Sequence, residues 1–184
     1  MTTSAIEIPD KSDDDIFRQH IFSFGAKGQA SWISAVKTDK VLFDKLFQLI
    51  FSEDKRLAWR SCWIIDTTSE KFPEILEDKI QTIISSLLIT KDGSLKRHFT
   101  RILSRYEIPE EYLGAIINRC FELLGPSEAP AIRVNSMQVL FNLAEQIPDL
   151  RGELSSVIEN LMEEGGSAGF MNRSAKILRL LQCQ

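Results

Sequence analysis

Residues 132–154 read IRVNSMQVLFNLAEQIPDLRGEL, and this stretch contains every marker of a pattern that recurs along the chain. Arg133 stands early in a segment whose apolar residues have helical spacing, Pro148 follows that segment, and Leu154 belongs to the start of the next one. Proline cannot continue a helix, because it lacks the backbone N–H, but it fits the first turn of a following helix. The stretch therefore predicts two helices that meet at a proline.

The three markers return at nearly constant intervals. They are Arg60, Arg97, Arg133 and Arg173; Pro73, Pro109 and Pro148; and Leu76, Leu113 and Leu154. The intervals lie between 36 and 41 residues, which matches a helix pair of HEAT or armadillo type and exceeds the tetratricopeptide unit of about 34 residues. We expect pairs at 40–51/53–67, 73–90/94–106, 110–124/129–146 and 149–164/169–182, with one or two further helices near 13–23 and 29–37.

The pattern also predicts how these helices form a core. No segment alternates apolar and polar residues as a half-buried strand would, so we predict an all-α chain. Neither helix of a pair can bury its apolar stripe alone, but stacked pairs share a continuous core. We therefore predict a right-handed α-solenoid of HEAT or armadillo type, with about four helix pairs and an N-terminal helical cap. Residues 16–184 would form this single domain, and the polar, acidic residues 1–15 a disordered or frayed tail.

Short polar side chains next to the expected helices are candidate N-caps. Asp39, Ser94 and Asp149 each precede or open an expected helix. A side-chain oxygen at this position can accept a hydrogen bond from a free N–H group of the first helical turn.

Four segments carry a resemblance to a known family. They are LAWRSCWII (57–65), LKRHFTRIL (95–103), IRVNSMQVLFNL (132–143) and GSAGFMNRSAKILR (166–179). Together they resemble a family of small bacterial HEAT-like repeat proteins of uncharacterised function, over roughly residues 40–182. Some members carry an automatic adenylosuccinate lyase label. Lyases of that kind have a G-S-S-x-M-P-x-K-x-N loop, whereas GSAGFMNRSAK has a different spacing and no proline, so we do not extend the lyase activity to this chain.

Composition limits the classes of function. The chain has 184 residues, 43% of them hydrophobic and 26% charged, with a net charge of −4. No overall basic field therefore indicates nucleic-acid binding. The N-terminal residues lack the apolar stretch of a secretory signal, and the most apolar run, residues 80–89, is too short to span a bilayer. Cys62, Cys120 and Cys183 lie far apart and form no C-x-x-C motif. We expect free thiols, a cytoplasmic protein and no membrane contact.

One stretch spells a catalytic motif. Residues 165–169 form G-x-S-x-G around Ser167, the spelling of a serine hydrolase nucleophile elbow. That elbow needs a strand before the serine and a histidine after it. An acidic helix is expected before Ser167, however, and both histidines, His20 and His98, come earlier in the chain. We predict that Ser167 belongs to the turn between two helices, where glycines can end the first helix.

Metal and cofactor sites are not indicated either. The histidines and cysteines have no metal-ligand spacing, and neither a P-loop nor H-E-x-x-H occurs. We therefore expect no metal and no cofactor.

A second catalytic hypothesis concerns Trp59, Trp63 and Asp66. HEAT-like DNA glycosylases use tryptophans and an aspartate around a damaged base, and base stacking with a carboxylate would suit that chemistry. The alternative is that two tryptophans one turn apart pack between helices. We favour packing, and we expect no enzymatic activity.

Charge separates the two helices of each expected pair. Net charges of 0, −2, −2 and −4 are carried by the first helices, counted over 39–51, 74–88, 110–122 and 149–164. Net charges of 0, +4, +1 and +3 are carried by the second helices, counted over 53–67, 94–106, 131–144 and 170–182. In solenoids of this type the second helices usually line the concave side, which would then be basic. The predicted basic strip consists of Arg60, Lys96, Arg97, Arg101 and Arg105, with Trp59 and Tyr106 as candidate aromatic contacts. No acid lies between residues 93 and 106, so we expect the arginines at 97–105 to be unpaired. We expect Arg60, Arg133 and Arg173 to pair with acids of their own or a neighbouring repeat.

These observations favour a non-catalytic binding scaffold. Its concave basic face would bind an acidic segment of a protein partner or another polyanion. The alternative is a nucleic-acid-binding protein, with or without repair activity around Trp59. Protein binding through the acidic convex face is a third hypothesis. The sequence does not determine the oligomeric state.

Overall fold

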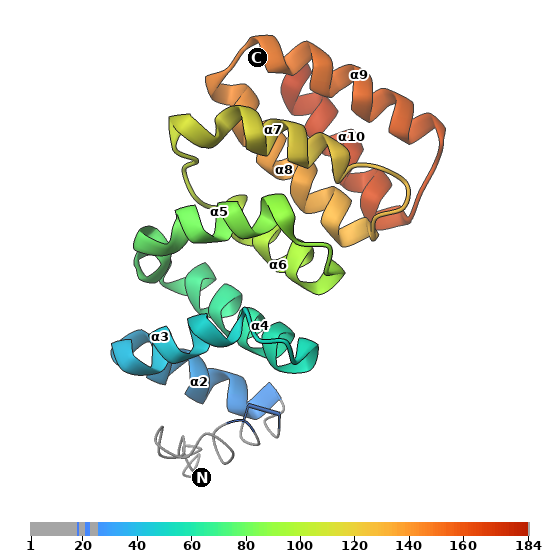
Figure 1. Ribbon diagram of the computed structural model, residues 1–184. Helices are drawn as coiled ribbons and strands as arrows, with labels where there is room; N and C mark the ends of the chain where they lie inside the picture. Colours follow the sequence, from blue (N-terminus) through green and yellow to red (C-terminus); the bar gives the residue numbers. More distant parts are fainter. Residues whose placement is uncertain (1–17, 19–20, 23–25, 184) are drawn as a thin grey trace. The chain divides into compact units, whose positions relative to one another are not determined.

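The computed structural model describes residues 18, 21–22 and 26–183 (Figure 1). The predicted tail at 1–15 and most of the predicted helix at 13–23 lie outside these residues. The regular elements are α2 (Ala26–Thr38), α3 (Lys40–Leu49), α4 (Lys55–Lys71), η1 (Pro73–Lys79), α5 (Ile80–Ile89), α6 (Gly93–Leu103), η2 (Glu110–Tyr112), α7 (Leu113–Glu122), α8 (Pro130–Gln146), α9 (Asp149–Glu163) and α10 (Ala168–Gln182). All of them are helices, so the all-α prediction is confirmed.

The predicted helix pairs are present, with one systematic difference. The first helices of the second and third pairs begin with short 3₁₀ segments, η1 and η2, before the α-helix proper. Pro73 opens η1, and Pro109 and Pro148 are the N-caps of η2 and α9. The prolines therefore mark the starts of the pairs, as their fixed backbone geometry predicts.

Of the three predicted N-cap residues, one caps a helix in the structure. Asp39 accepts a hydrogen bond from the Leu42 N–H at 3.0 Å, as predicted. The predictions for Ser94 and Asp149 are wrong. Asp92 caps α6 by accepting from Ser94 and Leu95. Asp149 is already the first residue of α9, whose N-cap, Pro148, makes no side-chain capping bond. A carboxylate at this place still interacts favourably with the helix dipole.

The chain divides into two compact units, Met1–Asp78 and Lys79–Gln184. In the first unit, α2 packs on both α3 and α4, which also pack on each other. The side chains of Trp32, Leu46, Leu57 and Ile65 are completely buried there. The prediction of one domain over 16–184 stays a prediction.

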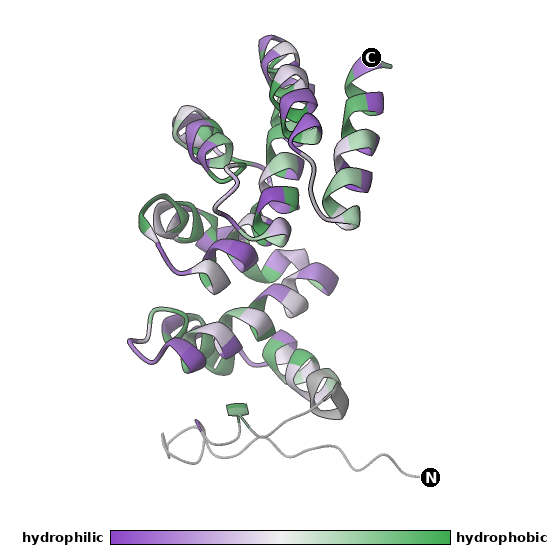
Figure 2. Ribbon diagram, turned by 90° about the vertical axis from the view of Figure 1, so that its right-hand side faces the viewer, coloured by the Kyte–Doolittle hydropathy of each residue, from purple (hydrophilic) through white to green (hydrophobic). Residues whose placement is uncertain are grey.

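The second unit consists of stacked helix pairs. Within the pairs, α5 packs on α6, α7 on α8 and α9 on α10. Between the pairs, α8 contacts both α6 and α10 and therefore lies between them (Figure 1). Hydrophobic residues gather where the helices meet, and hydrophilic residues lie on the opposite sides (Figure 2). We call the exposed surface of α6, α8 and α10 the B face.

Candidate binding surface

The turn before α10 resolves the G-x-S-x-G motif. Gly165 has a φ of 82°, the left-handed conformation that commonly ends a helix. Ser167 is the N-cap of α10, and its hydroxyl oxygen accepts a hydrogen bond from the Phe170 N–H at 3.3 Å. A helix, α9, precedes the motif in place of a strand. The prediction that Ser167 is a turn residue is confirmed.

Arg133 is one of the four arginines that mark the repeat, and each of the four has a different environment. Arg133 is buried, and its Nε donates a hydrogen bond at 2.8 Å to the carbonyl of Leu124, which lies in the turn just beyond α7. Its guanidinium lies over the Phe170 ring, 4.1 Å from the ring centroid. The predicted ion pair with an acid is therefore wrong for Arg133. The Arg133 guanidinium therefore supplies a donor to a buried turn carbonyl just after α7, close to the negative end of the helix dipole.

Two other arginines bind carbonyls at helix ends in the same way. Arg119 donates to the carbonyls of Leu87 and Thr90, at and just beyond the end of α5, and also pairs with Glu122. Arg151 donates to the Ala144 carbonyl near the end of α8. Arg119, Arg133 and Arg151 therefore bind carbonyls of the second unit itself.

Some of the basic residues predicted for the strip on α6 have contacts within the fold. Lys96 forms an ion pair with Glu128, which lies in the loop before α8. Arg101 and Arg105 are half-buried, and each has contacts of its own. Arg97 is exposed, with no side-chain partner among the residues that the structure describes. Among the described residues, Arg97 therefore fits the prediction of unpaired arginines at 97–105, whereas Arg101 and Arg105 are not free of contacts. Tyr106, just beyond α6, is half-buried and also has a contact.

A stripe of amide side chains joins α8 to α6. The Nδ2 of Asn135 donates to the Arg97 carbonyl at 3.1 Å, and that of Asn142 donates to the Ser104 carbonyl at 2.9 Å. The residues of each pair are 38 apart in sequence. Gln138 lies between them on the same face and donates to the Asn142 Oδ1 at 2.7 Å. These bonds hold α6 and α8 side by side in a defined register.

The same offset places further cations on α10. Arg173 is 38 residues beyond Asn135, and Lys176 is one turn further along the helix. Arg173 is half-buried and Lys176 exposed, and neither side chain has a hydrogen bond or ion pair with any residue in the described ranges. Within the described part of the chain, Arg173 therefore has no acid partner of the kind that we predicted for it. Our sequence-based strip omitted both residues, although the repeat period itself points to them.

The B face has a strongly unequal charge. Its helices carry Lys96, Arg97, Arg101, Arg133, Arg173, Lys176 and Arg179, against Glu145 as their one acid. On α9 and η2, by contrast, acidic residues outnumber basic ones. The predicted charge separation between the two kinds of helix therefore persists with the observed helix bounds.

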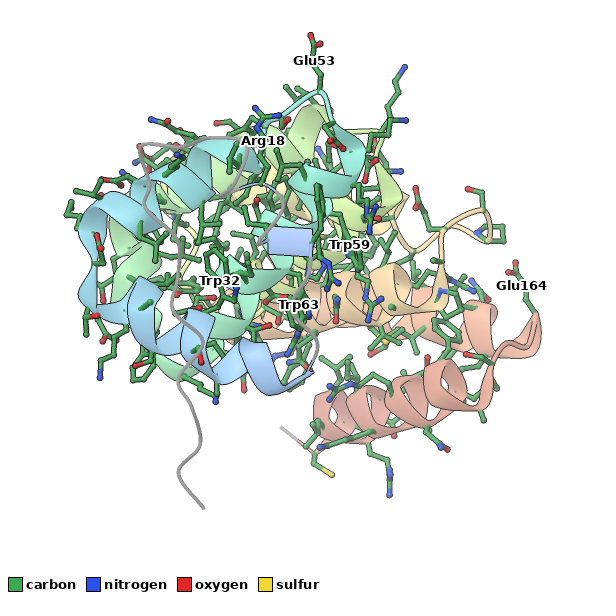
Figure 3. All side chains as sticks on the ribbon, turned by 90° about the horizontal axis from the view of Figure 1, so that it is seen from below. Arg18, Trp32, Glu53, Trp59, Trp63 and Glu164 are labelled. Atoms are coloured by element: carbon green, nitrogen blue, oxygen red, sulfur yellow. The ribbon has the colours of Figure 1, made fainter. Side chains whose placement is uncertain are left out.

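The tryptophans of α4 belong to the first unit. The Arg60 guanidinium lies 5.0 Å from the Trp59 ring centroid and 5.8 Å from that of Trp63. Trp59 is 37% exposed and Trp63 half-buried. Both side chains are labelled in Figure 3. Asp66 is completely buried, so its carboxylate is not accessible to a base stacked on Trp59. Arg60 and Trp59 lie in a different unit from α6, and the B face is therefore defined without them.

The described residues include the lining of two surface hollows and the buried thiol of Cys120. One hollow of about 490 Å³ lies between Pro109 and the end of α8, and one of about 430 Å³ lies in the first unit beside Phe43. Neither is lined by a serine, cysteine or histidine. Burial raises the pKa of Cys120 from 9.0 to about 12, despite the opposing effect of Arg119. The thiol therefore stays protonated and unreactive at neutral pH.

The described part of the chain can also be compared with the requirements of a metal site and of a membrane-spanning helix. No group of three potential metal ligands occurs among those residues. None of their helices is both long enough and apolar enough to cross a bilayer.

Comparison with known proteins agrees with the repeat architecture. The family model for the HEAT repeat domain matches residues 23–181, which is most of the chain. Neither a curated protein nor a solved structure matches it significantly. HEAT repeats generally act as scaffolds for protein interaction and are typically not enzymes. The stacked pairs and the family match confirm the predicted α-solenoid class, and the chain belongs to the HEAT repeat domain family.

Proposed function

We propose that this protein is a non-catalytic scaffold whose B face binds an acidic segment of another protein. The observation that carries this proposal is the set of three cations, Arg97, Arg173 and Lys176, that have no side-chain partner in the described part of the chain. They stand on two helices, α6 and α10, that contain no acidic residue. A partner's carboxylates would supply the missing counter-charges.

The B face is also preorganised for binding. The bonds from Asn135 and Asn142 hold α6 against α8, and the contact of Arg133 with Phe170 joins α8 to α10. The helix backbone that carries these charges is already ordered before a partner binds, so less of the interaction energy is spent on ordering it.

The chemistry of the face favours an acidic protein segment over a nucleic acid. Single strands bind to basic grooves that also present aromatic rings for stacking. In the described part of the second unit, the exposed large hydrophobic side chains are Ile89 and Leu180, neither of them aromatic. The chain as a whole is acidic, with a net charge of −4, which disfavours long nucleic acids.

Exchanging the free cations for acids tests the proposal. We expect Arg97→Glu/Arg173→Glu to weaken binding of a fluorescent peptide of alternating aspartate and serine by about tenfold or more, because each change replaces an attraction by a repulsion. The measurement is fluorescence anisotropy, at low salt and at about 0.15 M salt. The wild-type affinity should fall as salt rises.

A matched variant controls for net charge. Lys40→Glu/Lys91→Glu makes the same change in total charge at two exposed positions outside the B face. Equal losses in both double variants would show that only total charge matters, which would contradict the proposal. Tighter binding of labelled single- or double-stranded oligonucleotides than of the peptide, lost in the Arg97 variant, would instead support the nucleic-acid alternative.

A further inference from the structure

We infer that the partner carries two acidic groups about 16–20 Å apart, separated by a neutral stretch of extended chain. The inference rests on the proposed function, because it specifies the segment that the B face binds. It follows from the places of the cations and amides on the three helices, and from the spacing of packed helices, which is about 8–10 Å between neighbouring axes.

The free cations lie along two separate margins of the B face. Arg97 is on α6, Arg173 and Lys176 are on α10, and α8 lies between these helices. Neighbouring helix axes lie about 8–10 Å apart, so the distance from α6 across α8 to α10 is about 16–20 Å. One compact cluster of acids cannot reach both margins at contact distance.

Two cross-helix contacts place the cations in one row. The Asn135 side chain bonds to the Arg97 carbonyl, which sets the register of α8 on α6. Arg133 lies over Phe170, which sets the register of α10 on α8 with an offset of 37 residues. Asn135 is therefore level with Arg97 on one side and with residues 172–173 on the other. A segment crossing the three helices at this level meets Arg97, then Asn135, then Arg173.

The middle of this row is neutral and offers acceptors. Asn135 and Asn142 use their N–H groups on the α6 carbonyls, and Gln138 uses its own on Asn142. The oxygens of Asn135 and Gln138 have no hydrogen-bond partner within the described residues. Such oxygens can accept from backbone N–H groups of a partner, but they repel carboxylates. The stretch above α8 is therefore expected to be uncharged.

The distance sets the length of the neutral stretch. An extended chain rises about 3.3 Å per residue, so about five or six residues span the two margins. The expected segment has an acid at each end and polar, uncharged residues between them.

Peptides of equal composition test this spacing. One has two aspartate pairs separated by about six serines and glycines, and the other has all four aspartates adjacent, with the same serines and glycines. We expect the split peptide to bind about tenfold more tightly by fluorescence anisotropy, because only it reaches both margins. Arg173→Gln/Lys176→Gln should remove that advantage, so that the two peptides bind with equal affinity, within about twofold, to the remaining α6 margin.

The outcomes separate the two proposals. If the adjacent peptide binds as tightly as the split one, and Arg97→Glu weakens both, the spacing inference is overturned while the proposed function stands. If the split peptide keeps its advantage in the α10 variant, the inference is likewise overturned. If no acidic peptide binds at low salt, the proposed function fails, and the inference with it.

Discussion

Replacing Phe170 by alanine is expected to lower the free energy of unfolding by about 3–5 kcal/mol. The Phe170 side chain is 1% exposed. A Cβ added to Gly166 would lie 2.9 Å from the ring, so the turn before α10 is built closely around this side chain. The Arg133 guanidinium of α8 also lies over this ring, 4.1 Å from its centroid. Truncation therefore removes a large buried contact, opens a cavity and leaves a buried cation without its aromatic neighbour.

Urea denaturation followed by far-UV circular dichroism measures this effect. The signal must come from the helices, because Trp32, Trp59 and Trp63 all lie in the first unit. The matched control is Leu180→Ala on the same helix, where the side chain is 39% exposed, with an expected change of under about 0.5 kcal/mol. Similar small losses in both variants would show that α10 is not held through Phe170.

Replacing Arg133 by methionine is expected to cost about 2–4 kcal/mol, although methionine preserves much of the side-chain volume. The change removes a charge-assisted hydrogen bond to the Leu124 carbonyl, which is then buried without this donor. It also removes the cation–π contact with Phe170. If Arg133 were an ordinary surface cation, the same change would have an effect of under about 0.5 kcal/mol.

A double-mutant cycle separates the ring contact from the hydrogen bond. Arg133→Met, Phe170→Leu and the double variant should give a coupling free energy of about 0.5–2 kcal/mol, because the two side chains are in contact. Arg133→Lys should recover only part of the loss, since an ammonium cannot both reach the carbonyl and cover the ring. Additive effects of Arg133→Met and Phe170→Leu would contradict the proposed pairing.

The architecture was predictable from sequence because it depends on periodic features. Arginine, proline and leucine recur at intervals of 36 to 41 residues, and each marks a backbone event that depends on residue type and little on distant context. Helix ends were less predictable. Serine and aspartate are both preferred N-cap residues, so residue type does not distinguish Ser94 from Asp92. The backbone geometry makes Asp92 the N-cap.

The candidate site was predictable only in part, because charge pairing depends on distant residues. Lys96 has no acid nearby in the sequence, yet it pairs with Glu128, 32 residues away. Arg133 was expected to pair with an acid and instead binds a carbonyl and a ring. Arg173 was likewise expected to pair with an acid, and its side chain has no partner among the described residues. A period predicts which positions are equivalent, but not which of them remain available to a partner.

The most direct test of the central proposal is to map where an acidic peptide binds. Amide chemical shifts of ¹⁵N-labelled protein would be followed by NMR while the split peptide is added. We predict that the largest changes occur along α6, α8 and α10, around Arg97, Asn135 and Arg173, with little change on α7 and α9. Changes concentrated on the acidic α9, or in the first unit around Trp59, would show that the B face is not the binding surface.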